Sequence, residues 1–250
     1  MQPSLTALIM SDGIVIIPTY NEIENIESII RAVFSLSKDF HILVVDDNSP
    51  DKTAEKVIEL ENEFQGKLFL SVRKKKSGLG TAYVHGFRWA LKHHYEYIFE
   101  MDADFSHNPN DLEKLHDACH RQGADLAIGS RYVTGVNVVN WPLSRVLLSY
   151  FASVYVRMIT GMKIMDTTAG FICYHREVLE KINLDKIKFI GYAFQIEMKY
   201  RAFAKNFTIQ EVPVIFTDRT KGQSKMSGSI IKEAIFGVIS LRLKKFLNQL

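Results

Sequence analysis

The sequence predicts an α/β protein with a doubly wound, mostly parallel central sheet. Short runs rich in β-branched and aromatic residues alternate with longer amphipathic stretches through the first half of the chain. The short runs are apolar on both faces, which is typical of parallel strands buried between two layers of helices. Ligands of such sheets bind at the carboxyl ends of the strands, so the residues that follow each run are expected to carry the chemistry.

Five strands are expected in the first half of the chain, with a helix after each of the first four. The strands are expected at 14–17, 42–45, 68–70, 97–99 and 126–128. The helices are expected at about 22–36, 52–64, 80–94 and 109–121. The later elements are an apolar helix at 143–160, a helix at 192–205, a strand at 207–217 interrupted by Pro213, and a final helix from about Ser229.

The composition is that of an ordinary globular protein. Of the 250 residues, 47% are hydrophobic and 24% are charged, which excludes a disordered tail, a fibre or a bundle of membrane helices. The longest apolar run, between Arg145 and Arg157, is about half of the ~20 residues that a membrane-spanning helix needs. The first ten residues lack the basic start of a secretory signal, so we expect a cytoplasmic protein.

We expect one catalytic domain at 13–227, preceded by an extension at 1–12 and followed by an amphipathic helix at 228–250, with no transmembrane domain. Cys119 and Cys173 have no metal-ligand spacing and are expected to be buried free thiols. The net charge of +3 argues against a nucleic-acid partner. From Arg219 onward, however, seven basic residues face one acid, which favours an anionic partner such as a membrane phosphate or a phosphorylated substrate.

Polar turns follow the first two expected strands, at 18–22 and 46–53. Capping of the next helix would explain much of each turn, because Asn and Asp accept hydrogen bonds from the first helical N–H groups. Asp46 and Asp47 are less easily explained in this way, since adjacent carboxylates at the end of a buried strand repel unless a donor, a cation or a ligand offsets them.

The fourth strand leads into an acidic loop that contains Asp102 and Asp104 on either side of one small residue. Their carboxylates can converge on one hard cation, and oxygen ligands suit Mg²⁺ or Mn²⁺. An Asp-x-Asp sequence is also common in acidic turns, but its position at the end of a central strand strengthens the metal interpretation. A cation there would neutralise the charge that develops on a departing nucleotide diphosphate.

A basic loop at 73–80 follows the third strand and opens a helix. Its glycines allow close backbone approach and the helix N-terminus favours an anion, although a solvated basic loop is the alternative. The spacing matches neither phosphate-loop nor dinucleotide fingerprints. The segments 166–171 and 219–225 carry Gly and hydroxyl residues that suit substrate contact, or form turns only.

Taken in order, these segments resemble the family 2 glycosyltransferases of the GT-A fold, a nucleotide-diphospho-sugar transferase fold with a single Rossmann-like domain. The match is closest to the polyprenyl-phosphate sugar synthases, in particular the dolichyl-phosphate mannosyltransferases. The motifs that carry the resemblance lie at 18–22, 46–51, 78–80, 102–107, 129–132 and 191–198. The resemblance implies an inverting transfer of mannose from GDP-mannose to a polyprenyl phosphate, with Mg²⁺ or Mn²⁺ as cofactor.

The resemblance also implies roles for individual residues. The metal ligands would be Asp102 and Asp104. The donor nucleotide would be lined by Pro18, Tyr20, Glu22, Asp46, Asp47, Arg73, Gly78, Gly80 and Asp102, with Asp46 or Asp47 close to the base. The acceptor phosphate would face Arg131, Arg219, Ser224 and Lys225, and the catalytic set would be Asp104, Arg131, Arg219 and Lys225. Arginine suits phosphate because its planar fork binds two oxygens at once.

The absence of a carboxylate that could act as general base also favours a phosphate acceptor. Glycosyltransferases that attack with a sugar hydroxyl need a carboxylate base, which processive family members supply from a Glu-Asp pair. The matching stretch here, 194–197, lacks that pair. A phosphate monoester is already ionised at neutral pH, so it needs positioning more than deprotonation.

Two departures from the family pattern leave the sugar and the acceptor contacts open. Many relatives have Arg-Pro-Gly-Lys where this chain has 73–76, and Ser-Gly-Phe-Arg where it has 169–172, so an Arg contact near Ile172 is lost.

Two alternative functions stay open. They are the same transfer from UDP-glucose or UDP-N-acetylglucosamine, or a non-catalytic scaffold that binds nucleotide sugars. For His107, contact with the metal site is open, and capping or solvent exposure is favoured.

The chain is expected to meet its lipid at the cytoplasmic face of the membrane as a peripheral protein. The helix at 143–160 and the C-terminal helix, with Arg242, Lys244 and Lys245 at its end, can lie in the interface with basic residues toward lipid phosphates. Packing against the catalytic core or a membrane partner subunit is the alternative.

Overall fold

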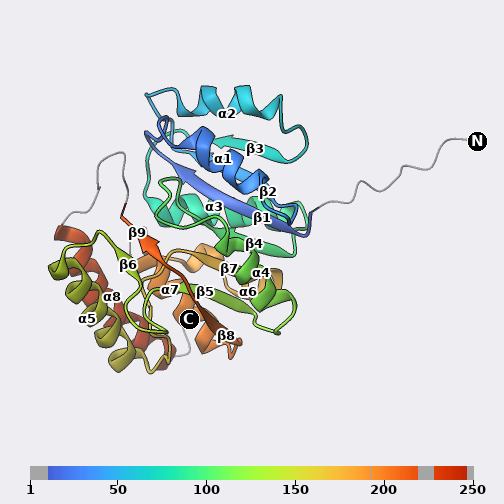
Figure 1. The fold of residues 1–250 in the computed structure, drawn as a ribbon. Coiled ribbons are helices and arrows are strands. Elements are labelled where there is room, and N and C mark those ends of the chain that lie inside the picture. Colours follow the sequence, from blue (N-terminus) through green and yellow to red (C-terminus); the bar gives the residue numbers. More distant parts are fainter. Residues whose placement is uncertain (1–10, 192, 219–227, 247–250) are drawn as a thin grey trace, which may run out of the picture.

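The computed structural model describes residues 11–191, 193–218 and 228–246, and within the last range it describes side chains from Gly237 onward. Its centre is a seven-stranded sheet in the order β3-β2-β1-β4-β7-β5-β8 (Figure 1). The first nine elements are β1 (Gly13–Thr19), α1 (Ile26–Phe34), β2 (His41–Asp46), α2 (Thr53–Glu61), β3 (Leu68–Val72), α3 (Leu79–Lys92), β4 (Tyr97–Glu100), α4 (Asp111–His120) and β5 (Leu126–Ser130). The α/β class and the alternation of the first half are thereby confirmed.

The second half of the chain is less regular. Its elements are β6 (Val138–Val139), α5 (Leu143–Thr160), β7 (Ile172–His175), α6 (Arg176–Lys181), a 3₁₀ turn (Leu184–Lys186), α7 (Ala193–Ala204), β8 (Ile209–Pro213), β9 (Phe216–Thr217) and α8 (Gly228–Phe246). Helix α5 has the expected bounds, and the expected strand at 207–217 is divided into β8 and β9 after Pro213. Strands β6 and β9 pair in a separate two-stranded sheet.

Strand β7 is the main departure from the sequence prediction, which placed no strand at this position. It runs antiparallel between β4 and β5, pairing with both, whereas the other neighbours in the large sheet are parallel. The sheet is therefore mixed at this point and parallel elsewhere.

The register of the parallel strands brings the informative turns together. Thr19 at the end of β1 lies beside Asp46 at the end of β2, and Ile16 lies beside Glu100 at the end of β4. Because parallel strands end at the same edge of a sheet, the turns after β1, β2 and β4 share one edge.

Each face of the sheet is covered by its own hydrophobic core, because successive strand residues point to opposite faces. Ile14 and Ile16 pack with residues of α3 and α7, while Val15 and Ile17 pack with residues of α1, α2 and α4. The two cysteines are buried free thiols, as expected.

Helices α5 and α8 lie side by side below the sheet in Figure 1, and α8 also contacts α7. Val156 of α5 and Val238 and Leu241 of α8 are buried in the core. One face of the α5–α8 pair therefore packs on the protein, as the packing alternative expected. Among the described residues, no helix has the length and hydropathy needed to cross a membrane.

Candidate active site

Asp46 links the turns after β1 and β2. Its carboxylate accepts hydrogen bonds from the Thr19 hydroxyl (2.8 Å), from the backbone N–H of Ser49 (2.9 Å) and from the Ser49 hydroxyl. The Ser49 hydroxyl oxygen in turn accepts from the backbone N–H of Asn21 (3.0 Å). Asp46 is completely buried, so these donors offset its charge and fix the two turns against each other.

A second set of bonds ties the same two turns together further along. Glu22 donates its backbone N–H to the Thr53 hydroxyl (3.0 Å), and Ile23 donates to the Asp51 carboxylate (3.0 Å). Burial alone would raise the pKa of Asp51, but the bonds from Thr53 and Ile23 outweigh it and hold that pKa below its usual value. The first turn is thus built from backbone groups held by polar side chains of the second.

Asp47 anchors the basic loop. Its carboxylate pairs with the Arg73 guanidinium, which also donates to the Thr81 hydroxyl (2.8 Å). The remaining nitrogen, Nη2 of Arg73, is buried and has no hydrogen-bond partner among the described residues. Lys76 lies over the Tyr20 ring at 4.3 Å from its centroid, which connects this loop to the first turn.

Gly78 and Gly80 are required by packing at the start of α3. Gly78 has φ +99°, and a Cβ on it would lie 3.0 Å from the Ile190 side chain. A Cβ on Gly80 would lie 2.7 Å from the Phe194 ring, and the Gly80 N–H donates to the Ile190 carbonyl (2.9 Å). The glycines allow α3 to begin directly against the segment that precedes α7, and their contact with a nucleotide stays a prediction.

The acidic loop follows β4 directly. Asp104 is 7% exposed, and its Oδ1 accepts the backbone N–H of Ser106 (3.1 Å) across a tight turn in which Phe105 has φ +59°. Asp102 accepts a hydrogen bond from the Tyr83 hydroxyl (3.3 Å). Burial, with the nearby Asp102 carboxylate, raises the pKa of Tyr83 well above its usual value, so the hydroxyl keeps the proton that it donates.

His107 neither caps α4 nor faces solvent, contrary to what the sequence favoured. Its ring is 4% exposed and stacks on Phe171 with centroids 4.8 Å apart. Burial lowers the pKa of His107 to about 4, so the ring is neutral and its Nδ1 accepts the backbone N–H of Asp102 (3.2 Å). The histidine therefore holds the backbone of the acidic loop in place.

Arg131 lies in a buried ion pair at the end of β5. Its guanidinium binds Asp166 through Nε and Nη2, both at 2.6 Å, and Nη2 also donates to the Thr168 hydroxyl (2.9 Å). The rings of Trp141 and Phe216 lie 5.3 and 5.5 Å from the guanidinium carbon. This arrangement fixes the orientation of Arg131, whose contact with a phosphate stays a prediction.

Three buried polar residues behind the acidic loop were not singled out from the sequence. Both oxygens of Glu100 are bound, one by the Tyr174 hydroxyl (3.0 Å) and the other by the Gln195 amide. Lys199 donates to the carbonyls of Ala169 (2.6 Å) and Gln195 (3.3 Å). Burial raises the pKa of Glu100 and lowers that of Lys199, which means that both groups are poorly solvated. In the sequence, Glu100 ends an apolar run and Gln195 lies in the stretch that lacks the Glu-Asp pair, but nothing marks Lys199 as buried.

Of the expected site residues, the structure places those from Pro18 to Asp104 at one edge of the sheet, in and around the turns after β1, β2, β3 and β4. Arg131 follows β5 and is fixed by Asp166. Arg219, Ser224 and Lys225 lie outside the described residues.

Two solved structures with nucleotide ligands have the same fold as this chain. Glucosyl-3-phosphoglycerate synthase from Mycobacterium tuberculosis, solved with Mn²⁺, UDP and glucosyl-3-phosphoglycerate, matches with a TM-score of 0.66 at 17% identity, over 93% of this chain and 79% of that one. TarS residues 1–349 from S. aureus, solved with UDP-GlcNAc, match with a TM-score of 0.62 at 21% identity, over 96% of this chain and 67% of that one. The chain thus shares the GT-A fold of these structures.

The chain belongs to glycosyl transferase family 2, whose family model matches residues 14–183. It is 50% identical to the polyprenol monophosphomannose synthase of Mycolicibacterium smegmatis, over 90% of this chain and 84% of the relative. It is 43% identical to the undecaprenyl-phosphate mannosyltransferase of Micrococcus luteus, over 89% of this chain and 90% of the relative. It is 38% identical to the dolichol-phosphate mannosyltransferase of Pyrococcus furiosus, over 88% of this chain and 60% of the relative.

Proposed function

We propose that this enzyme transfers mannose from GDP-mannose to a polyprenyl phosphate with inversion, giving a β-linked polyprenyl-phosphate mannose. The observation that carries the proposal is the acidic loop after β4, joined on one sheet edge by the turns after β1 and β2. The relatives named above, which are 38–50% identical, are all named for mannose transfer or synthesis on a polyprenyl-type lipid.

The donor nucleotide occupies the space bordered by the turns after β1, β2 and β3. The bonds to Asp46 fix the first two turns relative to each other, so these turns need little reordering when the nucleotide binds. Arg73 supplies the strongest indication of a ligand here, because its buried Nη2 lacks a partner within the described ranges and a buried donor normally has one. A nucleotide oxygen would satisfy it.

Asp102 and Asp104 are the residues that would hold a divalent cation at the donor diphosphate. Two carboxylates from one loop offer the oxygen ligands that Mg²⁺ and Mn²⁺ prefer. The loop is held in position because its carboxylates accept hydrogen bonds from Tyr83 and Ser106 and its backbone donates one to His107. The cation supplies neutralisation of the charge that develops on the departing GDP. The protein contributes two carboxylates that are held rigidly in a largely buried loop.

The acceptor phosphate attacks without a general base. The stretch that carries the base in processive relatives holds Gln195 here, and its amide is committed to Glu100. A phosphate is ionised at neutral pH, so catalysis requires a fixed cationic group to orient it. Arg131, held by Asp166 and Thr168, meets that requirement, and Arg219, Ser224 and Lys225 are assigned to the same phosphate by family analogy.

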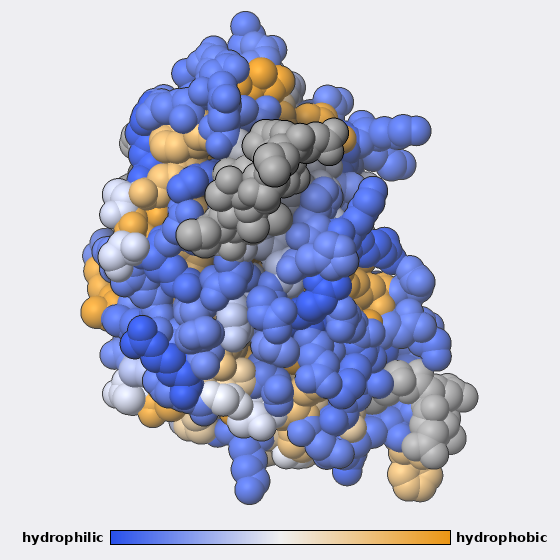
Figure 2. All heavy atoms as spheres, turned by 90° about the vertical axis from the view of Figure 1, so that its right-hand side faces the viewer, coloured by the Kyte–Doolittle hydropathy of each residue, from blue (hydrophilic) through white to orange (hydrophobic). Residues whose placement is uncertain are grey.

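The lipid reaches the site from the side of α5, and the protein is peripheral to the cytoplasmic face of the membrane. Large hydrophobic side chains are exposed along α5 and at the end of α8, at Leu143, Leu147, Leu148, Phe151, Met158, Leu243 and Phe246. Those at 143, 147 and 151 form a stripe at helical spacing. Figure 2 shows a different face, the right-hand side of Figure 1, where hydrophilic side chains predominate and hydrophobic ones are scattered.

The test incubates the purified chain with Mg²⁺, a short polyprenyl phosphate and, separately, GDP-mannose, UDP-glucose or UDP-N-acetylglucosamine. Mass spectrometry then detects the lipid product. A mannosylated lipid phosphate formed only from GDP-mannose is the expected result. Product from a UDP-sugar contradicts the donor assignment, and absence of product from all three contradicts the proposed reaction.

A further inference from the structure

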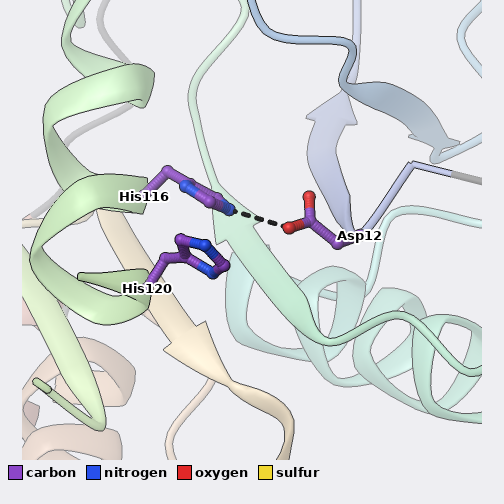
Figure 3. Close-up of side chains that lie close together, drawn as sticks. All are labelled: Asp12, His116 and His120. Carbon is purple, nitrogen blue, oxygen red and sulfur yellow. Dashed lines mark hydrogen bonds and ion pairs between the residues drawn. The ribbon is translucent and has the colours of Figure 1, made fainter.

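Three side chains with metal-binding atoms lie together at the edge of the sheet opposite the acidic loop. Asp12 immediately precedes β1, and His116 and His120 are on α4 (Figure 3). One ligand atom from each residue lies within 4.8 Å of the others. The seven residues of β1 separate this cluster from the turn at Thr19, which is more than about 20 Å at ~3.3 Å per residue. The cluster is therefore not part of the donor site.

The geometry of α4 aims both histidines at Asp12. Residues four apart lie on the same face of a helix, and Figure 3 shows both imidazoles projecting from α4 toward the carboxylate. His116 Nε2 lies 3.2 Å from Asp12 Oδ2. His116 is 2% exposed, and burial lowers its pKa, which favours the neutral ring that can coordinate a metal.

Tyr97 supports the second histidine. Its hydroxyl lies 3.2 Å from His120 Nδ1, and its ring packs edge-on against both His116 and His120. A histidine that binds a metal through one nitrogen usually donates its other N–H to an oxygen, which fixes the ring. With Nδ1 directed to Tyr97, Nε2 of His120 is the nitrogen that faces a cation.

We propose that Asp12, His116 and His120 form a second metal site, which binds Zn²⁺ or a similar late transition-metal ion. Two imidazole nitrogens and one carboxylate oxygen form a common set of three protein ligands for Zn²⁺, with water in the fourth position. The acidic loop, which has only oxygen ligands, prefers Mg²⁺ or Mn²⁺. The two ends of the sheet thus select different metals.

Lys38 acts as the competitor at this site. Its ammonium lies 3.1 Å from the nearer Asp12 oxygen, and Asp12 has a pKa below its usual value because its bonds to Lys38 and His116 outweigh the effect of burial. The carboxylate is therefore ionised and ready to bind a metal. The ammonium must move aside for a divalent ion, so the affinity is set by the competition between the two cations.

The test uses Co²⁺ as a spectroscopic probe in full-length protein that carries Asp104→Ala, which weakens the acidic-loop site. Co²⁺ bound by two imidazoles and a carboxylate at low coordination number gives intense visible absorption, and stoichiometric Zn²⁺ should abolish it. His120→Ala should lose the absorption without loss of fold, because His120 is exposed. His94→Ala removes an exposed histidine elsewhere and should leave the absorption intact.

Two further variants distinguish a specific metal site from nonspecific metal binding at the surface. Tyr97→Phe should weaken Zn²⁺ binding about 10- to 100-fold, as loss of an outer-shell partner does. Lys38→Met should strengthen it, because the competing cation is gone. The proposal is overturned if the unsubstituted cluster gives no Zn²⁺-sensitive absorption, or if His120→Ala binds Co²⁺ as the parent protein does.

Discussion

Asp104 is the residue on which the proposed transfer depends most directly. Asp104 is nearly buried, and the hydrogen bond that it accepts from Ser106 fixes its backbone turn. No neighbouring side chain can therefore easily take the place of its carboxylate. Asp104→Asn should lower kcat about 10²- to 10³-fold, the usual cost of losing one preorganised electrostatic group.

The measurement is the initial rate of mannosyl-lipid formation at saturating donor and Mg²⁺. Asp117→Asn is the matched control, because Asp117 lies on α4 and pairs with Arg121 at the surface. Retained activity in Asp104→Asn, or equal losses in both variants, would contradict the assignment of the metal to this loop.

Gly80, at the start of α3, packs tightly against Phe194 of α7. Gly80→Ala places a methyl group 2.7 Å from the Phe194 ring, and we expect a loss of about 1–3 kcal/mol in the free energy of unfolding from overpacking. Urea unfolding gives the value. The same substitution in a Phe194→Leu background should cost less, because the ring is gone and only the Phe189 carbonyl, 2.8 Å from the added methyl, still opposes it. Equal costs in the two backgrounds would show that the collision with the ring is not the cause.

At the scale of the element, the exposed face of α5 carries the membrane prediction. Leu147→Glu and Phe151→Glu each replace a side chain that the proposed interface would bury. Burial of a large apolar side chain contributes about 1.5–3 kcal/mol, so each substitution should lower the partition coefficient onto anionic liposomes by about tenfold or more.

Sedimentation with sucrose-loaded vesicles measures this partition. Ile58→Glu changes a similarly exposed hydrophobic residue on α2, away from α5, and should leave binding unchanged. If all three variants bind vesicles equally, the α5 face is not the membrane contact.

The elements that could be predicted from the sequence are those whose pattern is local. The two-sided apolar run at 14–17 and the helical pattern at 143–160 each contain their own signal, and both elements are present. Strand β7 could not be predicted in this way, because it lies in the second half of the chain, outside the strand–helix alternation from which the other short strands were predicted. Strand β7 is stabilised by pairing with β4 and β5, and the position between these two strands exists only after the chain has folded.

The same distinction holds for the site. The turns at 18–22 and 46–53 are contiguous in sequence and were found there, and the structure joins them through Asp46. The bond between Glu100 and Gln195 joins residues 95 positions apart, so neither residue revealed the other. His107 was misjudged because its burial comes from Phe171, which lies in another segment.

At the scale of the whole molecule, acidic residues with lowered pKa values make stability depend on pH. Asp12, Asp51 and Asp166 are the ones among them that are partly or fully buried, and hydrogen bonds and ion pairs outweigh the effect of burial and hold their pKa values below the usual value of an aspartate. A carboxyl group with a lowered pKa contributes stability that is complete above its unfolded-state pKa and is lost as the pH falls through its folded-state pKa.

We therefore expect the free energy of unfolding to fall steadily as the pH decreases below about 4–5. Urea unfolding at pH 7, 5, 4 and 3 measures it. Asp12→Asn, which removes one of these groups at a half-exposed position, should make the dependence shallower. A stability that stays constant from pH 5 to pH 3 would contradict the role given to these carboxylates.

The position of β7 in the sheet also determines when the sheet can be completed during synthesis on the ribosome. Strands β3, β2, β1 and β4 are complete once about 100 residues have emerged, and they can pair with one another at once. Strand β5 (Leu126–Ser130) emerges next but has neither of its neighbours when it does, because β7 ends at His175 and β8 ends at Pro213. Until then the nascent protein exposes an unpaired edge of β4, which is the kind of surface that chaperones shield from aggregation.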